Sequence, residues 1–153
     1  MGLGIRRPTW GDRTISVIGG WFTGNYCDLW GGAVATHSGG HINIGGSAVF
    51  TTNEAAWEGG AVIACWNSQM TIGDSTFIDN YSDLEGGALY SGMIWDNGDP
   101  AGGNADARIE IEGRARFEGN SAAYRGGALR VGHLSKVWVS GEVEFIGNHA
   151  GDE

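Results

Sequence analysis

One pattern recurs along the chain: a phenylalanine, an asparagine three residues later, and a Gly-Gly-Ala that begins six residues after the asparagine. The pattern occurs in full from Phe22, Phe50, Phe77 and Phe117, and another copy begins at Phe145. Successive phenylalanines are 28, 27, 40 and 28 residues apart, so the period is about 28 residues with one insertion of about 12. A period of this size indicates a solenoid or a propeller.

The residues between the repeated motifs predict strands. Apolar residues alternate, and 29 of the 153 residues are glycine, which argues against helical repeats. Each period holds three short strand signals, such as 61–63 after the Gly-Gly pair, 70–72, and a third that ends at Phe77. We therefore predict an all-β fold, a single-stranded parallel β-helix (β-solenoid) of about five coils with three short strands per coil.

Stacked coils would place equivalent residues directly above one another. The phenylalanines would form an aromatic column inside the solenoid, and the asparagines would form a hydrogen-bonded ladder at a corner. Repetition in every coil is what a fold needs, whereas an active site needs no repetition, so we interpret these residues as structural. The predicted structural ladder consists of Phe22, Phe50, Phe77, Phe117, Phe145, Asn25, Asn53, Asn80, Asn120 and Asn148.

This combination of Phe-x-x-Asn and Gly-Gly-Ala-[Val/Leu] resembles the repeat of the chlamydial polymorphic outer membrane proteins and related bacterial surface proteins. A small residue two positions after each asparagine, as at Ala55 and Ala122, fits the same pattern. The resemblance covers nearly the whole chain. It implies a right-handed β-helical passenger at a cell surface, with roles in adhesion and self-association and without enzymatic activity. An autotransporter barrel, which that family carries, is not visible in this sequence.

Composition limits the remaining function classes. We expect a single β-solenoid domain over 1–153, because a solenoid needs only neighbouring coils to bury its core. The net charge of −9, with nine scattered Lys and Arg residues, argues against a nucleic-acid partner. We see neither an apolar run of 18 residues nor an intact signal peptide. Cys27 and Cys65 occupy different places in their coils, so a disulfide and two buried thiols both remain open.

Both ends of the sequence fall close to a Gly-Gly position. Gly2 and Gly4 lie where the first coil should have its Gly-Gly strand, and the chain stops at Glu153, just before the next Gly-Gly would fall. A β-helix normally covers its terminal coils, because an open coil presents unpaired main-chain groups. Two explanations fit: a subunit that stacks head to tail into a filament, or a segment excised from a longer passenger.

One segment breaks the repeat, the insertion from Gly92 to Asp106. Loops on a rigid solenoid often carry recognition, so it is either a solvated loop or a lateral contact. Its acidic residues lack a calcium-binding spacing. Tryptophans at outward or loop positions add to the candidates for an interaction surface. These candidates are Trp21, Trp66, Trp95, Trp138, Asp96 and Asp99.

We predict no catalytic, cofactor-binding or metal-binding residues. His37 and His41 lack a third ligand at a recognisable spacing. The outward strand positions gather no acid pair, and only Glu144 beside Arg116 combines charges there. The sequence therefore favours a non-enzymatic extracellular or cell-surface β-solenoid that is structural or adhesive. Its expected partners are other copies of itself, or a host or cell-surface protein or glycan. The alternative is a carbohydrate-binding or polysaccharide-processing β-helix.

Overall fold

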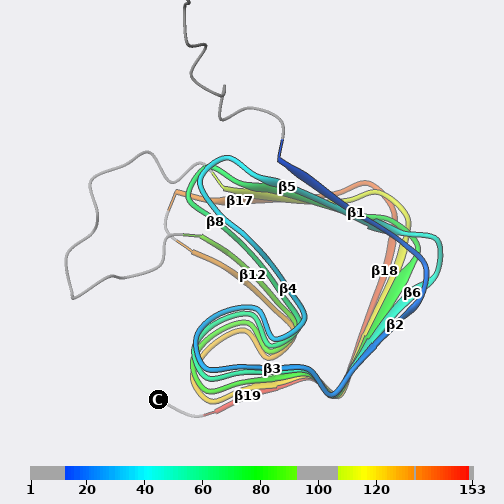
Figure 1. Cartoon of the computed structure of the whole chain (residues 1–153). Helices are drawn as coiled ribbons and strands as arrows, with labels where there is room; N and C mark the ends of the chain where they lie inside the picture. The colour runs from blue at the N-terminus through cyan, green and yellow to red at the C-terminus, as the bar shows by residue number, and fades with distance from the viewer. Residues whose placement is uncertain (1–12, 93–106, 133, 152–153) are drawn as a thin grey trace, which may run out of the picture.

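The computed structural model describes residues 13–92, 107–132 and 134–151, and these residues form a parallel β-solenoid (Figure 1). The predicted fold class is confirmed: all strand pairings are parallel, successive coils stack about 28 residues apart, and the described residues contain no helix. They make about four turns, against the five expected for the entire chain. The insertion lies almost wholly outside the described residues.

The described strands form four parallel sheets that run along the solenoid axis. Sheet A holds β1 (Thr14–Ile18), β5 (His41–Gly45), β9 (Gln69–Ile72), β13 (Arg108–Ile111) and β17 (Lys136–Val139). Sheet B holds β2 (Trp21–Thr23), β6 (Ala48–Thr51), β10 (Ser75–Ile78), β14 (Arg114–Glu118) and β18 (Glu142–Ile146). Sheet C holds β3 (Tyr26–Cys27), β7 (Glu54–Ala55), β11 (Tyr81–Ser82), β15 (Ser121–Ala122) and β19 (His149–Ala150). Sheet D holds β4 (Val34–Thr36), β8 (Val62–Cys65), β12 (Leu89–Gly92) and β16 (Leu129–Val131).

Each of the first four described coils therefore contributes four strands, where the sequence predicted three. The three predicted strands are those of sheets D, A and B. Sheet C is additional, and each of its strands has two residues, too few to produce an alternating pattern. It includes the small-residue positions, such as Ala55 and Ala122, which pair in register through Ser82.

The core lies between sheets A, B and D. Phe50, Phe77 and Phe117 are fully buried, and neighbouring rings in the five-member column stack with centroids 4.6–5.0 Å apart and planes within 14°. Offset stacking of this kind adds roughly 0.5–1.5 kcal/mol per pair to the burial of the rings. Ile42, Met70 and Ile109 pair in register on sheet A and fill the same core.

The insertion does not disturb the stacking. Phe77 pairs with Phe117 across the 40-residue spacing, and Thr71 pairs with Glu110 on sheet A. A parallel pairing that slipped by one residue would turn every apolar side chain of the strand outward, so burial of the core fixes this register. The extra residues are therefore accommodated between β12 and β13 without a change in coil geometry.

The segments that join sheet C to sheet D curl back on themselves, and we call them the hooks (Figure 1). They comprise residues 28–33, 56–61, 83–88 and 123–128. Each hook contains one Gly-Gly pair. The first glycine has a positive φ of 65–70°, as at Gly59 and Gly86, a conformation that a side chain disfavours. The second lies against the main chain of the next coil: a Cβ on Gly87 would come within 2.3 Å of the Ser121 carbonyl oxygen.

Candidate interaction surfaces

The last described coil leaves core positions open. Phe145 is 56% exposed and Val139 is 55% exposed, whereas Phe117 and Ile111, one coil earlier, are at most 1% exposed. A shallow hollow of about 400 Å³ lies over this coil and is lined by Phe145, Asn148 and the Gly126-Gly127 pair, among others. The coil therefore presents an apolar surface in the shape that the next coil would fill.

The asparagine ladder gives this stack a direction. Asn53 donates from its main-chain N–H and from Nδ2 to Oδ1 of Asn80, at 3.0 and 2.9 Å, and its Nδ2 also donates to the Phe22 carbonyl at 2.8 Å. The same three bonds join each internal asparagine to the coils on either side. Within the described residues, Oδ1 of Asn25 receives no donor and the main-chain N–H of Asn148 finds no acceptor. One end thus offers acceptors and the other offers donors.

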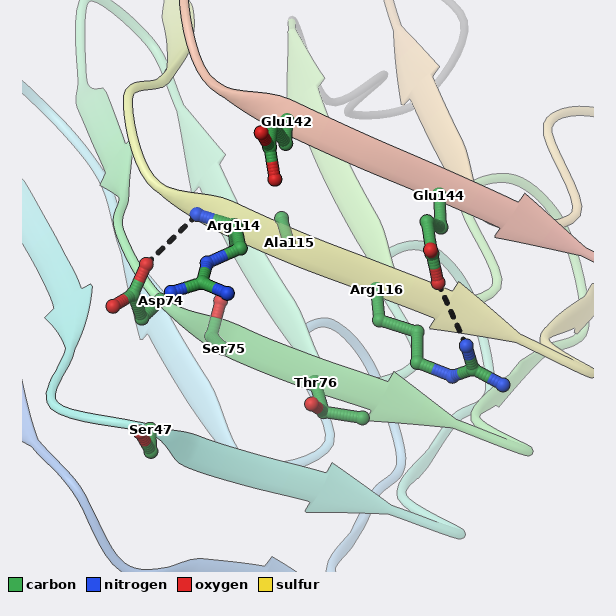
Figure 2. Close-up of a pocket in the computed structure, with 9 residues that line it drawn as sticks. All are labelled: Ser47, Asp74, Ser75, Thr76, Arg114, Ala115, Arg116, Glu142 and Glu144. Atoms are coloured by element: carbon green, nitrogen blue, oxygen red, sulfur yellow. Dashed lines mark hydrogen bonds and ion pairs between the residues drawn. The ribbon is translucent and has the colours of Figure 1, made fainter.

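The outer face of sheet B carries a polar cleft of about 340 Å³ (Figure 2). Arg116 crosses it, with Nη1 2.7 Å from Glu144 and Nη2 2.9 Å from Glu118. Hydrogen bonds to Glu118 and then Glu144 raise the pKa of the Arg116 guanidinium, so it stays charged. The Arg114 main-chain N–H donates to Asp74 at 2.8 Å, and the Arg114 side chain lines the cleft (Figure 2). Within the described residues, the Arg114 guanidinium has no ion-pair partner.

The structure separates the predicted interaction residues. Trp21 is 82% exposed at the start of sheet B. Trp138 is 46% exposed on β17, and Arg108 and Lys136 lie over its ring at 5.5 and 5.9 Å from the centroid. Trp66 instead packs partly buried beside Cys65. The remaining candidates, Trp95, Asp96 and Asp99, lie outside the described residues. The described candidates therefore do not form one patch.

A second apolar cluster lies on the outer face of sheet D. Period-two alternation predicts that Ile63 and Tyr90 point to solvent. Their side chains do point away from the main core, but the two residues are only 1% and 2% exposed. The hooks explain this burial, because the first glycine of each pair lies against these residues: a Cβ on Gly59 would be 3.1 Å from the Ile63 Cβ. Trp30 and Trp66 pack against the cluster of Ile63, Cys65 and Tyr90.

Two carboxylates meet beside this cluster, and sequence analysis missed them. Glu58 and Glu85 precede the Gly-Gly pairs of successive hooks and pair across the coils, followed by Arg125 in the next. Glu85 forms ion pairs with Arg130 at 3.2 Å and Arg125 at 3.7 Å. Glu58 is 6% exposed, and within the described part of the chain its buried Oε2 has no hydrogen-bond partner. Two acidic residues at the same place in adjacent repeats were the sequence signal that could have found this pair.

Burial sets the protonation of these groups. Desolvation, with a smaller effect from the nearby Glu85 charge, raises the pKa of Glu58 to about 7. Burial and then Glu58 raise the pKa of the Cys65 thiol to about 12, so it is a neutral thiol at physiological pH. Burial, followed by Glu58 and Glu85, also raises the pKa of Tyr90. Glu58 is thus the group in this cluster that titrates near neutrality.

The described residues hold no group of three His, Cys, Asp or Glu side chains arranged to bind a metal ion. Cys27 and Cys65 are free thiols. No helix capable of crossing a membrane occurs in the part of the chain that the structure describes.

These features define the class of the protein: a parallel β-solenoid built from a repeat of about 28 residues. Residues 74–92 match the family model of the Chlamydia polymorphic membrane protein repeat, which confirms the resemblance. The match spans β10 to β12 and includes Phe77, Asn80 and the Gly86-Gly87 pair. The family of this repeat is one of structural or surface proteins, which suggests a surface-associated β-solenoid. Comparison with curated proteins and with solved structures gives no match.

Proposed function

We propose that this chain is a structural element of a cell surface that extends by end-to-end stacking of its coils on those of a second copy. The observation that carries the proposal is the direction of the asparagine ladder. When the last described coil of one copy meets the first of another, Asn148 can donate to Oδ1 of Asn25, and Asn25 Nδ2 can donate to the Phe145 carbonyl. These are the bonds that every internal pair of coils makes.

The apolar surfaces support the same arrangement. Phe22 stacks on Phe50 and has no ring on its other side among the described residues, and Phe145 is in the same position at the opposite end. A second copy would bury both rings and the exposed Val137 and Val139. The two contacting surfaces differ, so the contact is heterologous and propagates into a filament rather than closing into a dimer. A filament of this kind would display its outer faces for adhesion.

We expect Phe145→Glu to abolish stacking, because it places a charge in the aromatic column between two copies. The matched control is Trp138→Glu on the same coil, whose side chain points outward from sheet A. Sedimentation velocity across a range of concentrations, with negative-stain microscopy, measures the outcome. The wild type and the control should form rods that lengthen with concentration, while Phe145→Glu stays a single particle. A wild type that remains monomeric at every concentration would exclude the proposal.

A second candidate function is saccharide binding in the cleft of sheet B. The observation in its favour is the Arg114 guanidinium, which has no ion-pair partner among the described residues and lines the cleft together with Thr76. We expect Arg114→Ala to lose at least tenfold in binding to an acidic glycan, and Trp138→Glu to bind normally. A glycan array followed by titration tests this, and a reducing-sugar assay tests for cleavage. An array without hits would remove this candidate.

A further inference from the structure

The hooks cover a surface that the solenoid fold itself does not need to bury. Sheet D completes the main core with its inner face, whereas Ile63, Cys65 and Tyr90 lie on its outer face. The first three hooks cover them there, with Trp30 of the first hook packed against the cluster. The second hook is held to the third by bonds from Gly59 N–H to the Glu85 carbonyl at 3.0 Å and from Gly60 N–H to the Gly86 carbonyl at 3.0 Å. Residues 56–60 of the second hook can therefore loosen while Ala61, its last residue, stays packed in the main core.

Glu58 lies where the second hook meets sheet D. A carboxylate that is removed from water needs hydrogen bonds or an opposite charge, and among the described residues Oε2 of Glu58 is buried with no hydrogen-bond partner. The two arginines nearby pair with Glu85 instead. This part of the hook borders a cavity of about 280 Å³ that Glu58 lines with Glu85 and Arg125, among others, yet Oε2 itself is closed off from solvent. The position of Glu58 is a place where the charge of one carboxyl group decides how stable the closed hook is.

We propose that Glu58 is a proton-operated latch: the second hook stays closed on sheet D while the Glu58 carboxyl is protonated, and it opens when that group ionises. Opening uncovers Ile63, Cys65 and Tyr90, so the protein presents an apolar surface at neutral to basic pH and hides it in acid. This inference is independent of the proposed end-to-end stacking, since the hooks lie on the side of the solenoid.

The other charged and titratable groups around Glu58 do not replace it as the trigger. Glu85 on the third hook is paired with Arg125 on the fourth hook and Arg130 on β16. Cys65 on β8 and Tyr90 on β12 face Glu58 as neutral groups, because burial raises both of their pKa values well above 7. A Glu whose pKa is raised on folding binds its proton more tightly in the closed state. The free energy that favours the closed hook therefore falls as the pH rises from about 4.5 to about 7. Above about pH 7 this free energy stays at its lower value.

The test measures opening through modification of Cys65 by a small alkylating reagent. Cys27→Ser removes the other thiol, and serine already occupies the equivalent position at Ser82. The alkylation rate of Cys65 is measured at each pH in the Cys27→Ser protein and in the same protein with Glu58→Gln. The ratio of the first rate to the second cancels the pH dependence of thiol chemistry. We expect a ratio within about fivefold of one near pH 4.5 that rises to about 300 by pH 8, because the two pKa values lie about 2.5 pH units apart and each unit between them changes the opening equilibrium tenfold.

Glu54→Gln, an exposed carboxylate in the same coil, is the matched control and should give the wild-type rate at every pH. A ratio that stays flat with pH would overturn the proposal. If Glu58→Gln does not fold, amide hydrogen exchange of the wild type gives the same answer. Protection of the Gly59 and Gly60 amides should fall more than tenfold from pH 5 to 8 after correction for intrinsic rates, while the Asn80 amide keeps its protection. The same change in protection for the Asn80 amide as for the Gly59 and Gly60 amides would also overturn the proposal.

Discussion

Replacing Asn80 with alanine is expected to remove about 4 kcal/mol or more from the free energy of unfolding. Asn80 is fully buried, and its side chain accepts from the Asn53 N–H and Nδ2 and donates to Asn120 Oδ1 and the Phe50 carbonyl, all within 2.8–3.0 Å. Alanine leaves two donors of Asn53 and one carbonyl buried without partners, and each such group costs roughly 1–3 kcal/mol. Typical total stabilities are only about 5–15 kcal/mol, so a large fraction would be lost.

Denaturant unfolding followed by circular dichroism measures this effect. The matched control is Asn43→Ala, because Asn43 is exposed on the outer face of sheet A in a neighbouring coil. Surface substitutions of this kind change stability by less than about 0.5 kcal/mol. Similar losses for the two variants would mean that the buried amide ladder contributes little to stability, against our account of the corner.

Gly87→Ala is expected to separate neighbouring coils, with a loss of about 3 kcal/mol or more, at the upper end of what overpacking costs. The added Cβ would lie 2.1 Å from the Gly127 carbonyl oxygen and 2.3 Å from that of Ser121. Both atoms belong to the main chain of the next coil, so no side-chain rotation relieves the clash. The coils must move apart, which breaks the ladder at sheet C and at the hook.

Gly45→Ala provides the contrast. A Cβ at Gly45 would meet nothing within 4 Å, and the residue has an ordinary φ within β5. Alanine there should be neutral or stabilise by up to about 1 kcal/mol, because it reduces the freedom of the unfolded chain. Thermal unfolding of the two variants side by side separates the two cases. If Gly87→Ala unfolds like the wild type, the Gly-Gly pair is not required by close approach of the coils.

The repeat made the main core predictable. Residues at one place in every period have one environment, so Phe77 and Ile72 could be placed inside without any knowledge of the third dimension. The register across the insertion followed in the same way, since the phenylalanine on each side of it marks the same rung. Periodic sequences carry this information because each coil contacts only its neighbours.

The sequence did not predict the burial of residues on the outer face of sheet D, because that burial depends on how the chain returns from sheet C to sheet D. The hooks fold over the outer face of sheet D, so Ile63 and Tyr90 are buried on the side that alternation assigns to solvent. Burial there is a property of the hook, and no strand pattern reports it. Glu58 was missed for the same reason, because a residue beside a Gly-Gly turn ordinarily reads as an exposed loop position.

The most direct test of the stacked coils is a distance across the insertion. Nitroxide labels at Thr71 and Glu110, 39 positions apart in the sequence, sit on adjacent rungs of sheet A and point outward. Adjacent strands lie about 4.8 Å apart, so continuous-wave EPR should show strong dipolar broadening, corresponding to label separations under roughly 15 Å. Cys27→Ser and Cys65→Ala keep the labelling specific. Spectra without broadening, equal to the sum of the two singly labelled proteins, would contradict the solenoid.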